Sequence, residues 1–92
     1  MFLHIGENEI VTIKDIIGVF SVDLMEKNKN NRKVKKKARS ESRWFKVSRK
    51  NDKSMVLTQR DEYIISPISV STLRKRITNF DLNFGKNERG VE

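Results

Sequence analysis

Residues 63–80, YIISPISVSTLRKRITNF, join the end of a strand to an amphipathic helix through Pro67, the single proline of the chain. The first three residues are apolar and β-branched or aromatic, which favours a strand. Ser69 is placed as the N-cap of the helix, where its hydroxyl can accept a hydrogen bond from a free N–H. The apolar residues that follow have the three- and four-residue spacing of one helical face: Val70, Leu73, Ile77 and Phe80.

Two hairpins and one further strand are expected upstream of this helix. Residues 1–13 read as strand, polar turn and strand, because apolar β-branched runs flank the sequence GENE. Residues 54–65 repeat this pattern around the polar turn QRDE. Residues 16–22, IIGVFSV, favour a strand, although a short buried helix is the alternative. Gly18 in the middle of that run indicates a bulge or a close backbone approach.

These elements predict an α+β fold, in which a small antiparallel sheet of two hairpins plus an extra strand carries a C-terminal helix. We expect one domain over 1–80 and a mobile tail over 81–92. Both runs of the second hairpin are apolar on alternate and adjacent positions, so both faces should be covered, one of them by a helix or another subunit. Roughly sixty residues form the expected core, and the chain has no cysteine for disulfides. A homo-oligomer is therefore predicted.

The positive charge of the chain is concentrated in residues 27–50. This segment holds twelve of the twenty Lys and Arg residues and a single acid, Glu41. Asparagines at 28, 30 and 31 are poor helix formers, and neighbouring lysines repel one another along a helix. We therefore expect a basic loop over about 24–43, or a helix that begins near Leu24 and frays, ordered when its charge is neutralised. A solvated linker is the alternative.

A dense positive segment beside nearly neutral flanks favours a polyanionic partner, and nucleic acid is the most abundant polyanion in a cell. Trp44 and Phe45 lie among bases, an arrangement typical of a stacking platform for single strands. The alternative, which we favour, is that residues 44–47 return to the core as a strand. The candidate nucleic-acid contacts in and around this segment are Lys35, Lys36, Lys37, Arg43, Lys46, Arg49, Lys50 and Lys53.

The sequence argues against several other classes of function. It contains no carboxylate pair, Ser/His/Asp set or Gly-rich phosphate loop, so an enzyme is not expected. With one histidine, His4, and no cysteine, neither a metal site nor a cofactor is predicted. A membrane helix and a signal peptide are not expected either, and the chain reads as cytoplasmic. The remaining alternative to a DNA-binding regulator is an interaction module whose basic segment binds an acidic protein or RNA.

Three motifs together resemble the RemA/RemB family of bacterial extracellular-matrix regulators, and the RemB branch most closely. They are HIG at 4–6 before EIVTIKDIIGVF, YIISP at 63–67, and SVSTLRKR at 69–76. The matching stretches cover about half of the chain. RemA proteins usually have Arg after the second strand, where this chain has Asp15, and that departure fits RemB better.

The resemblance implies a small α+β subunit that assembles into a ring, binds double-stranded DNA along a basic rim and controls biofilm-matrix genes. In the RemA branch, bases just before the penultimate strand contact DNA. Those positions are held here by Arg49, Lys50 and Lys53. The lysines at 35–37 are expected to reinforce this contact through charge, and a RemA-type protein is a candidate partner. Because no recognition helix for the major groove is evident, we expect binding dominated by phosphate contacts.

Overall fold

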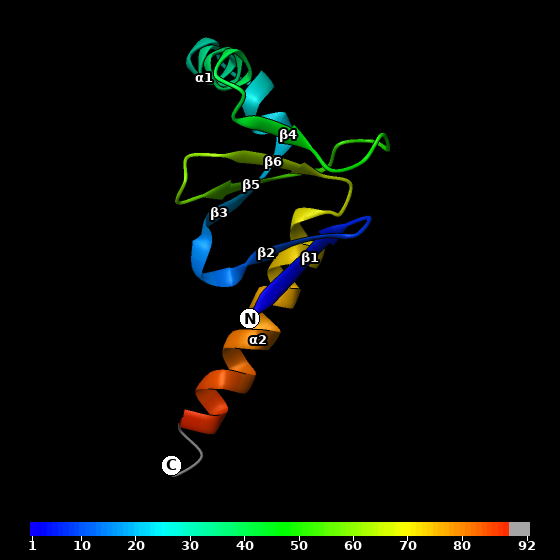
Figure 1. Ribbon diagram of the computed structural model, residues 1–92, viewed down its shortest axis with the longest axis vertical. Coiled ribbons are helices and arrows are strands. Elements are labelled where there is room, and N and C mark those ends of the chain that lie inside the picture. The colour runs from blue at the N-terminus through cyan, green and yellow to red at the C-terminus, as the bar shows by residue number, and fades with distance from the viewer. Residues whose placement is uncertain (89–92) are drawn as a thin grey trace.

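The computed structural model describes the backbone of residues 1–88 and the side chains of residues 1–79. It has the predicted α+β composition, with short 3-10 helices (η) beside the longer α-helices (Figure 1). In chain order the elements are β1 (Phe2–Gly6), β2 (Glu9–Thr12), η1 (Ile13–Asp15), β3 (Ile16–Ser21), η2 (Val22–Glu26), α1 (Lys29–Ser40), β4 (Trp44–Lys46), β5 (Ser54–Thr58), β6 (Tyr63–Ser66) and α2 (Val70–Glu88).

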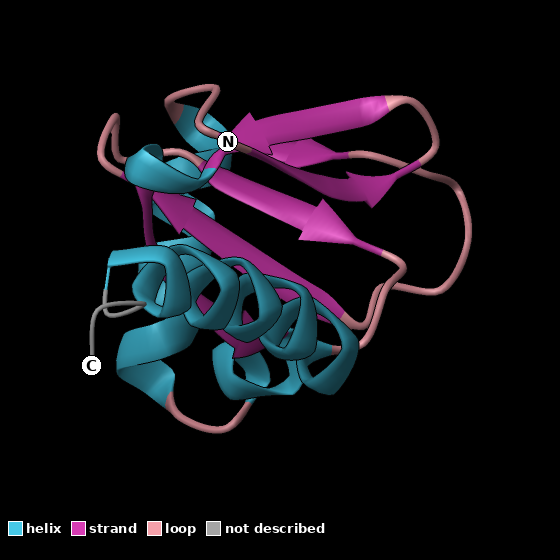
Figure 2. Cartoon of the chain, turned by 90° about the horizontal axis from the view of Figure 1, so that it is seen from below, coloured by secondary structure: helices cyan, strands magenta, loops and turns pink. Residues whose placement is uncertain are grey.

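The strands form two sheets. The hairpin of β1 and β2 is a sheet of its own, and β3, β5, β6 and β4 form a mixed sheet in that order. In the mixed sheet β5 pairs antiparallel with β3 and β6, whereas β4 pairs parallel to β6. Figure 2, seen from below, shows strands across the upper and middle parts of the view and helices in its lower left part. Both predicted hairpins, the extra strand β3 and the C-terminal helix are confirmed, but the parallel pairing of β4 was not predicted.

Each face of the mixed sheet has its own core. The α2-side core consists of aliphatic residues from β1, β3, β5 and α2: Leu3, Ile5, Val19, Val56 and Leu73. The α1-side core combines residues from η2, α1, β5 and β6: Met25, Ala38, Met55, Tyr63 and Ile65. Successive residues of β5 alternate between the two cores, as the period of a strand requires. The predicted two-sided burial is confirmed, and helices of the same chain lie over both faces.

The two sheets are joined where β6 leads into α2. The hydroxyl of Ser66 donates a buried hydrogen bond of 2.6 Å to the carbonyl oxygen of Ile5. Gly6 has a φ of 121°, and a Cβ added there would lie 3.0 Å from Cδ of Pro67. An L-residue would therefore be strained at this position and would also press on the proline. This contact unites the HIG and YIISP motifs.

Helix α2 has the predicted cap and apolar face. The N–H of Thr72 donates to Oγ of Ser69 at 3.3 Å, and Leu73 is fully buried. The helix continues to Glu88, beyond the predicted end at Phe80. The Phe80 side chain and residues 89–92 lie outside the described residues, so the apolar contact of Phe80 and the mobility of the tail remain predictions.

Helix α1 corrects the prediction for the basic segment. It begins at Lys29 and continues to Ser40, instead of beginning near Leu24 and giving way to a loop. The side chain of Asn28 accepts a 2.8 Å hydrogen bond from the N–H of Asn31, so Asn28 is the N-cap. The side-chain amide of Asn31 in turn donates to the carbonyl of Leu24 at 2.8 Å. The asparagines that seemed to oppose a helix therefore start it and fix its position.

Candidate nucleic-acid interface

The three bases implied by the family resemblance lie together on the β4–β5 loop, residues 47–53. Arg49, Lys50 and Lys53 are all exposed. Among the side chains of residues 1–79, none of the three forms an ion pair with an acid. The loop projects at one side of the molecule, next to the turn between β1 and β2 (Figure 1). Three free cations on a projecting loop form a surface that can contact phosphate groups.

The base of this loop is fixed to both sheets. The hydroxyl of Ser48 donates to Oε1 of Glu7 at 2.9 Å and accepts from the N–H of Lys50 at 3.1 Å. At the other end, the N–H of Lys53 donates to the carbonyl of Ser66 at 2.9 Å. These bonds hold the loop backbone at both ends, so the three cations project from a backbone of fixed position.

Lys46 is less available to a ligand than the three basic side chains of the β4–β5 loop. Its Nζ lies 3.3 Å from Oδ1 of Asp52, although half of its side chain is exposed. It belongs to β4, the edge strand that precedes the loop. Because the pair is exposed, its net stabilisation is small, and a phosphate can compete with Asp52 for the ammonium group.

Arg43 holds three parts of the chain together and does not present its charge freely. Its guanidinium contacts Oε1 of Glu41 at 2.6 Å and Oδ2 of Asp61 at 3.0 Å, and it donates to the Asp61 carbonyl at 2.7 Å. The hydrogen bond from Arg43 lowers the pKa of the Glu41 carboxyl below its ordinary value, and the positive charges of Arg43 and Lys37 act in the same direction. The same hydrogen bond raises the pKa of the Arg43 guanidinium. This geometry gives Arg43 a structural role.

Lys35 turns towards its own chain as well. Its Nζ forms an ion pair with Glu26 at 3.0 Å and lies 5.2 Å from the ring centre of Trp44. The Trp44 ring stacks on Tyr63 with 5.8 Å between the ring centres. Both neighbours cover the indole, which favours the interpretation of residues 44–47 as a strand over a stacking platform. Phe45, in contrast, is 43% exposed and faces away from the α1-side core.

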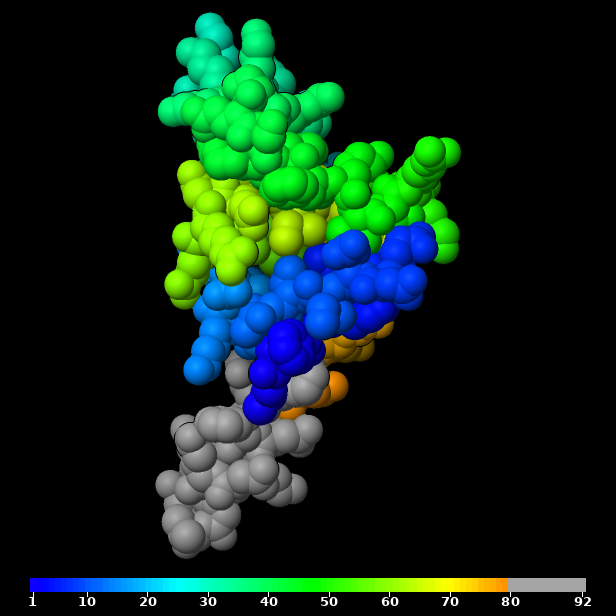
Figure 3. Space-filling model, in the orientation of Figure 1, coloured from blue at the N-terminus to red at the C-terminus, as the bar shows by residue number. Residues whose placement is uncertain are grey.

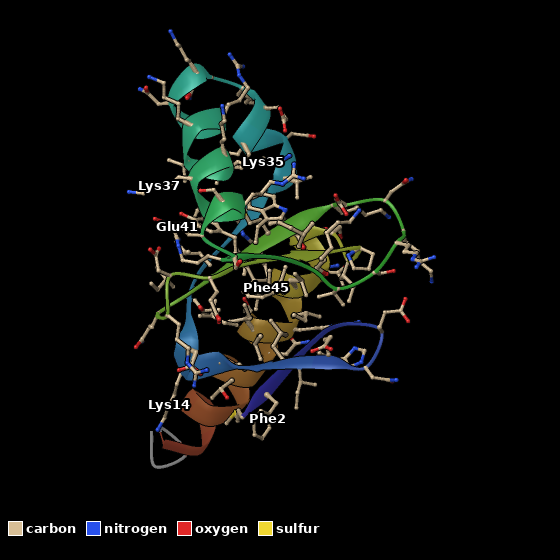
Figure 4. The ribbon with its side chains drawn as sticks, turned by 45° about the horizontal axis from the view of Figure 1, so that its top comes forward. Phe2, Lys14, Lys35, Lys37, Glu41 and Phe45 are labelled. Atoms are coloured by element: carbon tan, nitrogen blue, oxygen red, sulfur yellow. The ribbon has the colours of Figure 1, made fainter. Side chains whose placement is uncertain are left out.

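Lys36 and Lys37 are exposed on the side of α1 that faces away from the sheet. Figure 4 shows Lys37 pointing into solvent and Lys35 on the other side of the helix. The other exposed bases of this helix were not predicted as contacts. The 3.6-residue period around the buried Ala38 could have found them once α1 was accepted as a helix. These additional bases are Lys29, Arg32, Lys33 and Arg39.

The predicted contacts thus divide into two separate surfaces and two structural residues. The β4–β5 loop carries one surface, and the outer side of α1 carries the other. In the space-filling view, α1 forms one end of the molecule and the loop projects from its flank (Figure 3). Arg43 and Lys35 belong to neither surface, because both are bound to acids of their own chain.

The described part of the chain contains no group of three His, Asp or Glu side chains that could hold a metal ion. None of its helices is both long enough and apolar enough to cross a membrane.

Comparison with protein families gives one match. The model of the RemA-like family, described as "Extracellular matrix regulatory protein A-like", matches residues 2–77. This range contains both sheets, α1 and the β4–β5 loop. A comparison with curated individual proteins finds no match. The family match covers most of the chain, and the chain therefore belongs to the RemA-like family of extracellular matrix regulatory proteins.

Proposed function

We propose that this protein is a transcriptional regulator that binds duplex DNA through the β4–β5 loop of a homo-oligomer. The observation that carries the proposal is the exposed trio of Arg49, Lys50 and Lys53, which forms no ion pair among the described side chains. The trio also occupies the position to which the family resemblance assigns DNA contact. Lys46 adjoins it and can join once phosphate displaces Asp52.

The side chains of the loop favour contact with the phosphate backbone of DNA over recognition of its base edges. Arg and Lys side chains bind phosphate oxygens without regard to sequence, whereas base reading needs a helix or ribbon seated in a groove. A 3-residue edge strand and a loop present no such element. We therefore propose that specificity comes from the shape of the DNA and from the geometry of the assembly.

Assembly is supported by apolar side chains that the single chain leaves exposed. Phe2 and Ile10 are 59% and 52% exposed on the outer face of the first hairpin. Ile17, at 61%, lies at the bulge of β3. A second subunit is not needed to bury both faces of the mixed sheet, because α1 and η2 cover the face that α2 does not cover. The exposure of these three apolar side chains, which an interface between subunits would bury, is therefore the reason to propose an oligomer.

Control of matrix genes is proposed from the family description. The RemB branch remains the finer assignment that we favour, on the motifs at 4–6, 63–67 and 69–76, and a RemA-type protein remains a candidate partner. We also propose that the chain acts in the cytoplasm by binding alone and does not catalyse a reaction.

The proposal is tested by charge reversal at the loop. We expect Arg49→Glu with Lys50→Glu to abolish the mobility shift of a duplex, because two phosphate contacts in every subunit become repulsive. For the unchanged protein, a contact of ~6–10 phosphates should lose ~10³–10⁵ in affinity between 50 and 200 mM salt. Light scattering should give the same oligomer, larger than the 10.8 kDa chain, for both proteins.

The matched control is Lys14→Glu with Arg60→Glu, which makes the same charge change at exposed positions away from the loop. This control should keep most of its affinity. If the loop variant binds as well as the control, the loop is not the contact. If single-stranded RNA competes better than the duplex for the unchanged protein, the ligand class is wrong.

A further inference from the structure

The outer side of α1 carries a concentration of charge that the loop contact does not use. Seven of the twelve residues in α1 are Lys or Arg, and none is an acid. Lys35 faces inward to Glu26, and Arg32 donates from Nη1 to the carbonyl of Glu26 at 3.1 Å. The other five bases are exposed and form no ion pair with any described side chain: Lys29, Lys33, Lys36, Lys37 and Arg39.

Three of these cations form a stripe. Lys29, Lys33 and Lys36 are spaced by four and three residues, so they lie on one line along the helix. Ala38, which is fully buried against the sheet, occupies the opposite side of the helix. The stripe therefore faces directly away from the body of the protein, where a large ligand can reach it.

The helix is held in this orientation by its inner side. The bond from Asn31 to the carbonyl of Leu24 and the ion pair of Lys35 with Glu26 fix it against η2, and the Asn28 cap fixes its first turn. Like charges repel at four i,i+4 pairs within α1: Lys29–Lys33, Arg32–Lys36, Lys33–Lys37 and Lys35–Arg39. The cations of α1 thus repel one another, and a bound polyanion would reduce this repulsion.

We infer that the outer side of α1 is a second duplex-binding surface, separate from the β4–β5 loop, which binds the phosphate backbone. A 12-residue helix is about 18 Å long, and duplex DNA carries one negative charge per ~1.7 Å of its axis, so a full row of phosphates lies within reach of the row of cations. The inference rests on the proposed function for the class of ligand but not for the loop as its site.

A lipid surface fits α1 less well. A helix that lies in a membrane interface needs a wide apolar side beside its basic one. The apolar residues of α1 are Val34 and Ala38, and Ala38 is buried against the sheet. Val34 alone, 41% exposed, does not provide such a side.

The test compares three neutralised variants of the full chain, each with three substitutions to Gln. The α1 variant carries Lys29→Gln, Lys33→Gln and Lys36→Gln, and the loop variant carries Arg49→Gln, Lys50→Gln and Lys53→Gln. The control carries Lys14→Gln, Arg60→Gln and Lys75→Gln, all at exposed positions outside both surfaces. Gln resembles Lys in helix propensity, so α1 should remain helical, which circular dichroism checks. The probe is a 30-base-pair duplex of mixed sequence, followed by fluorescence anisotropy across a salt series.

We expect the α1 variant to reduce the slope of log affinity against log salt by about 1 for each phosphate that the helix no longer neutralises, up to about 3 for each bound subunit. Its affinity at 100 mM salt should fall by about tenfold or more, whereas the control should change little. A slope and affinity equal to those of the control would overturn the inference. If the loop variant alone loses affinity, the proposed loop contact stands and the α1 surface does not. If the α1 variant alone loses affinity, the α1 surface binds DNA and the proposed loop contact is wrong.

Discussion

The two faces of the mixed sheet are covered by helices of very different composition. On one face, the α2-side core joins Leu73 of α2 to aliphatic residues of β1, β3 and β5. On the other face, α1 contributes one buried residue, Ala38, to a core made of methionines, Tyr63 and Ile65. Polar contacts of Asn31, Arg32 and Lys35 with η2 add to this attachment, and Asn28 caps the helix. One helix therefore stabilises the fold, and the other is fixed with little apolar burial and can devote most of its surface to charge.

The largest difference between the two faces should follow from Leu73→Asp. The substitution places a charge without a partner in the α2-side core, at a cost of about 4–5 kcal/mol or more, which a domain of this size does not withstand. Circular dichroism should show loss of the fold, and light scattering should show loss of the assembly. Thr78→Asp makes the same charge change on the exposed side of α2 and should fold normally. A folded, assembled Leu73→Asp protein would mean that the α2 face does not stabilise the fold as described.

On the α1 face, Trp44→Ala should release the helix without unfolding the sheet. Truncation of a fully buried Trp to Ala lowers the free energy of unfolding by ~3–5 kcal/mol. Trp44 is partly buried, so we expect a loss of about 2 kcal/mol. Hydrogen exchange should accelerate in α1 and remain slow in the first turns of α2. Phe45→Ala, at the exposed neighbouring position, should have a smaller effect. Equal acceleration in both helices would show that the two faces are not independent.

The polar cap that starts α1 is tested by Asn28→Ala. Loss of the cap leaves an unsatisfied N–H at Asn31 and should cost about 1 kcal/mol. The free energy of unfolding from urea titration gives this value directly. Asn30→Ala, at an exposed position in the first turn, should be neutral or slightly stabilising because Ala is the better helix former. If both variants are equally stable, the cap does not hold the helix.

The smallest effect is expected at the junction of α1 and β4, where Glu41 contacts Arg43. Because the pKa of the folded carboxyl lies below its ordinary value of 4.5, its stabilisation is complete above that value and disappears as pH falls through the folded-state pKa. Glu41→Gln should therefore be less stable than the unchanged protein at pH 7, and the difference should vanish in acid. Urea titrations at several pH values measure it, with Glu9→Gln as an exposed control. A difference that persists unchanged into acid would exclude the carboxylate as its source.

The elements with a strong apolar period were predictable from sequence. The spacing of Val70, Leu73 and Ile77 located α2, and Gly18 marked the irregularity in β3 that the structure places between Ile16 and Gly18. The start and the full length of helix α1 were not predicted, because propensity and charge repulsion both oppose it and favour a loop or a fraying helix. What decides in its favour is the Asn28 cap together with the tertiary packing of Ala38, and a local pattern does not reveal that packing.

The candidate site was predictable to a similar extent. Exposure of Arg49, Lys50 and Lys53 follows from their position in a polar loop. Glu41, the local partner of Arg43, lies two residues away in the sequence. The pairs of Arg43 with Asp61 and of Lys35 with Glu26 were not predictable, because the fold brings these acids close. Composition thus identified the charge, and tertiary structure determined which part of it is free to bind.

The most direct test of the account is a lysine footprint on the unchanged protein, with the modified lysines identified by mass spectrometry. The protein is acetylated with a soluble ester reagent, with and without a saturating 30-base-pair duplex, at low salt. We predict that DNA protects Lys50 and Lys53 of the loop and the α1 stripe, Lys29, Lys33 and Lys36, whereas Lys14 and Lys75 react as before. Protection that is equal at all exposed lysines, or strongest at Lys14 and Lys75, would contradict the claim that the loop and the outer side of α1 are where DNA binds.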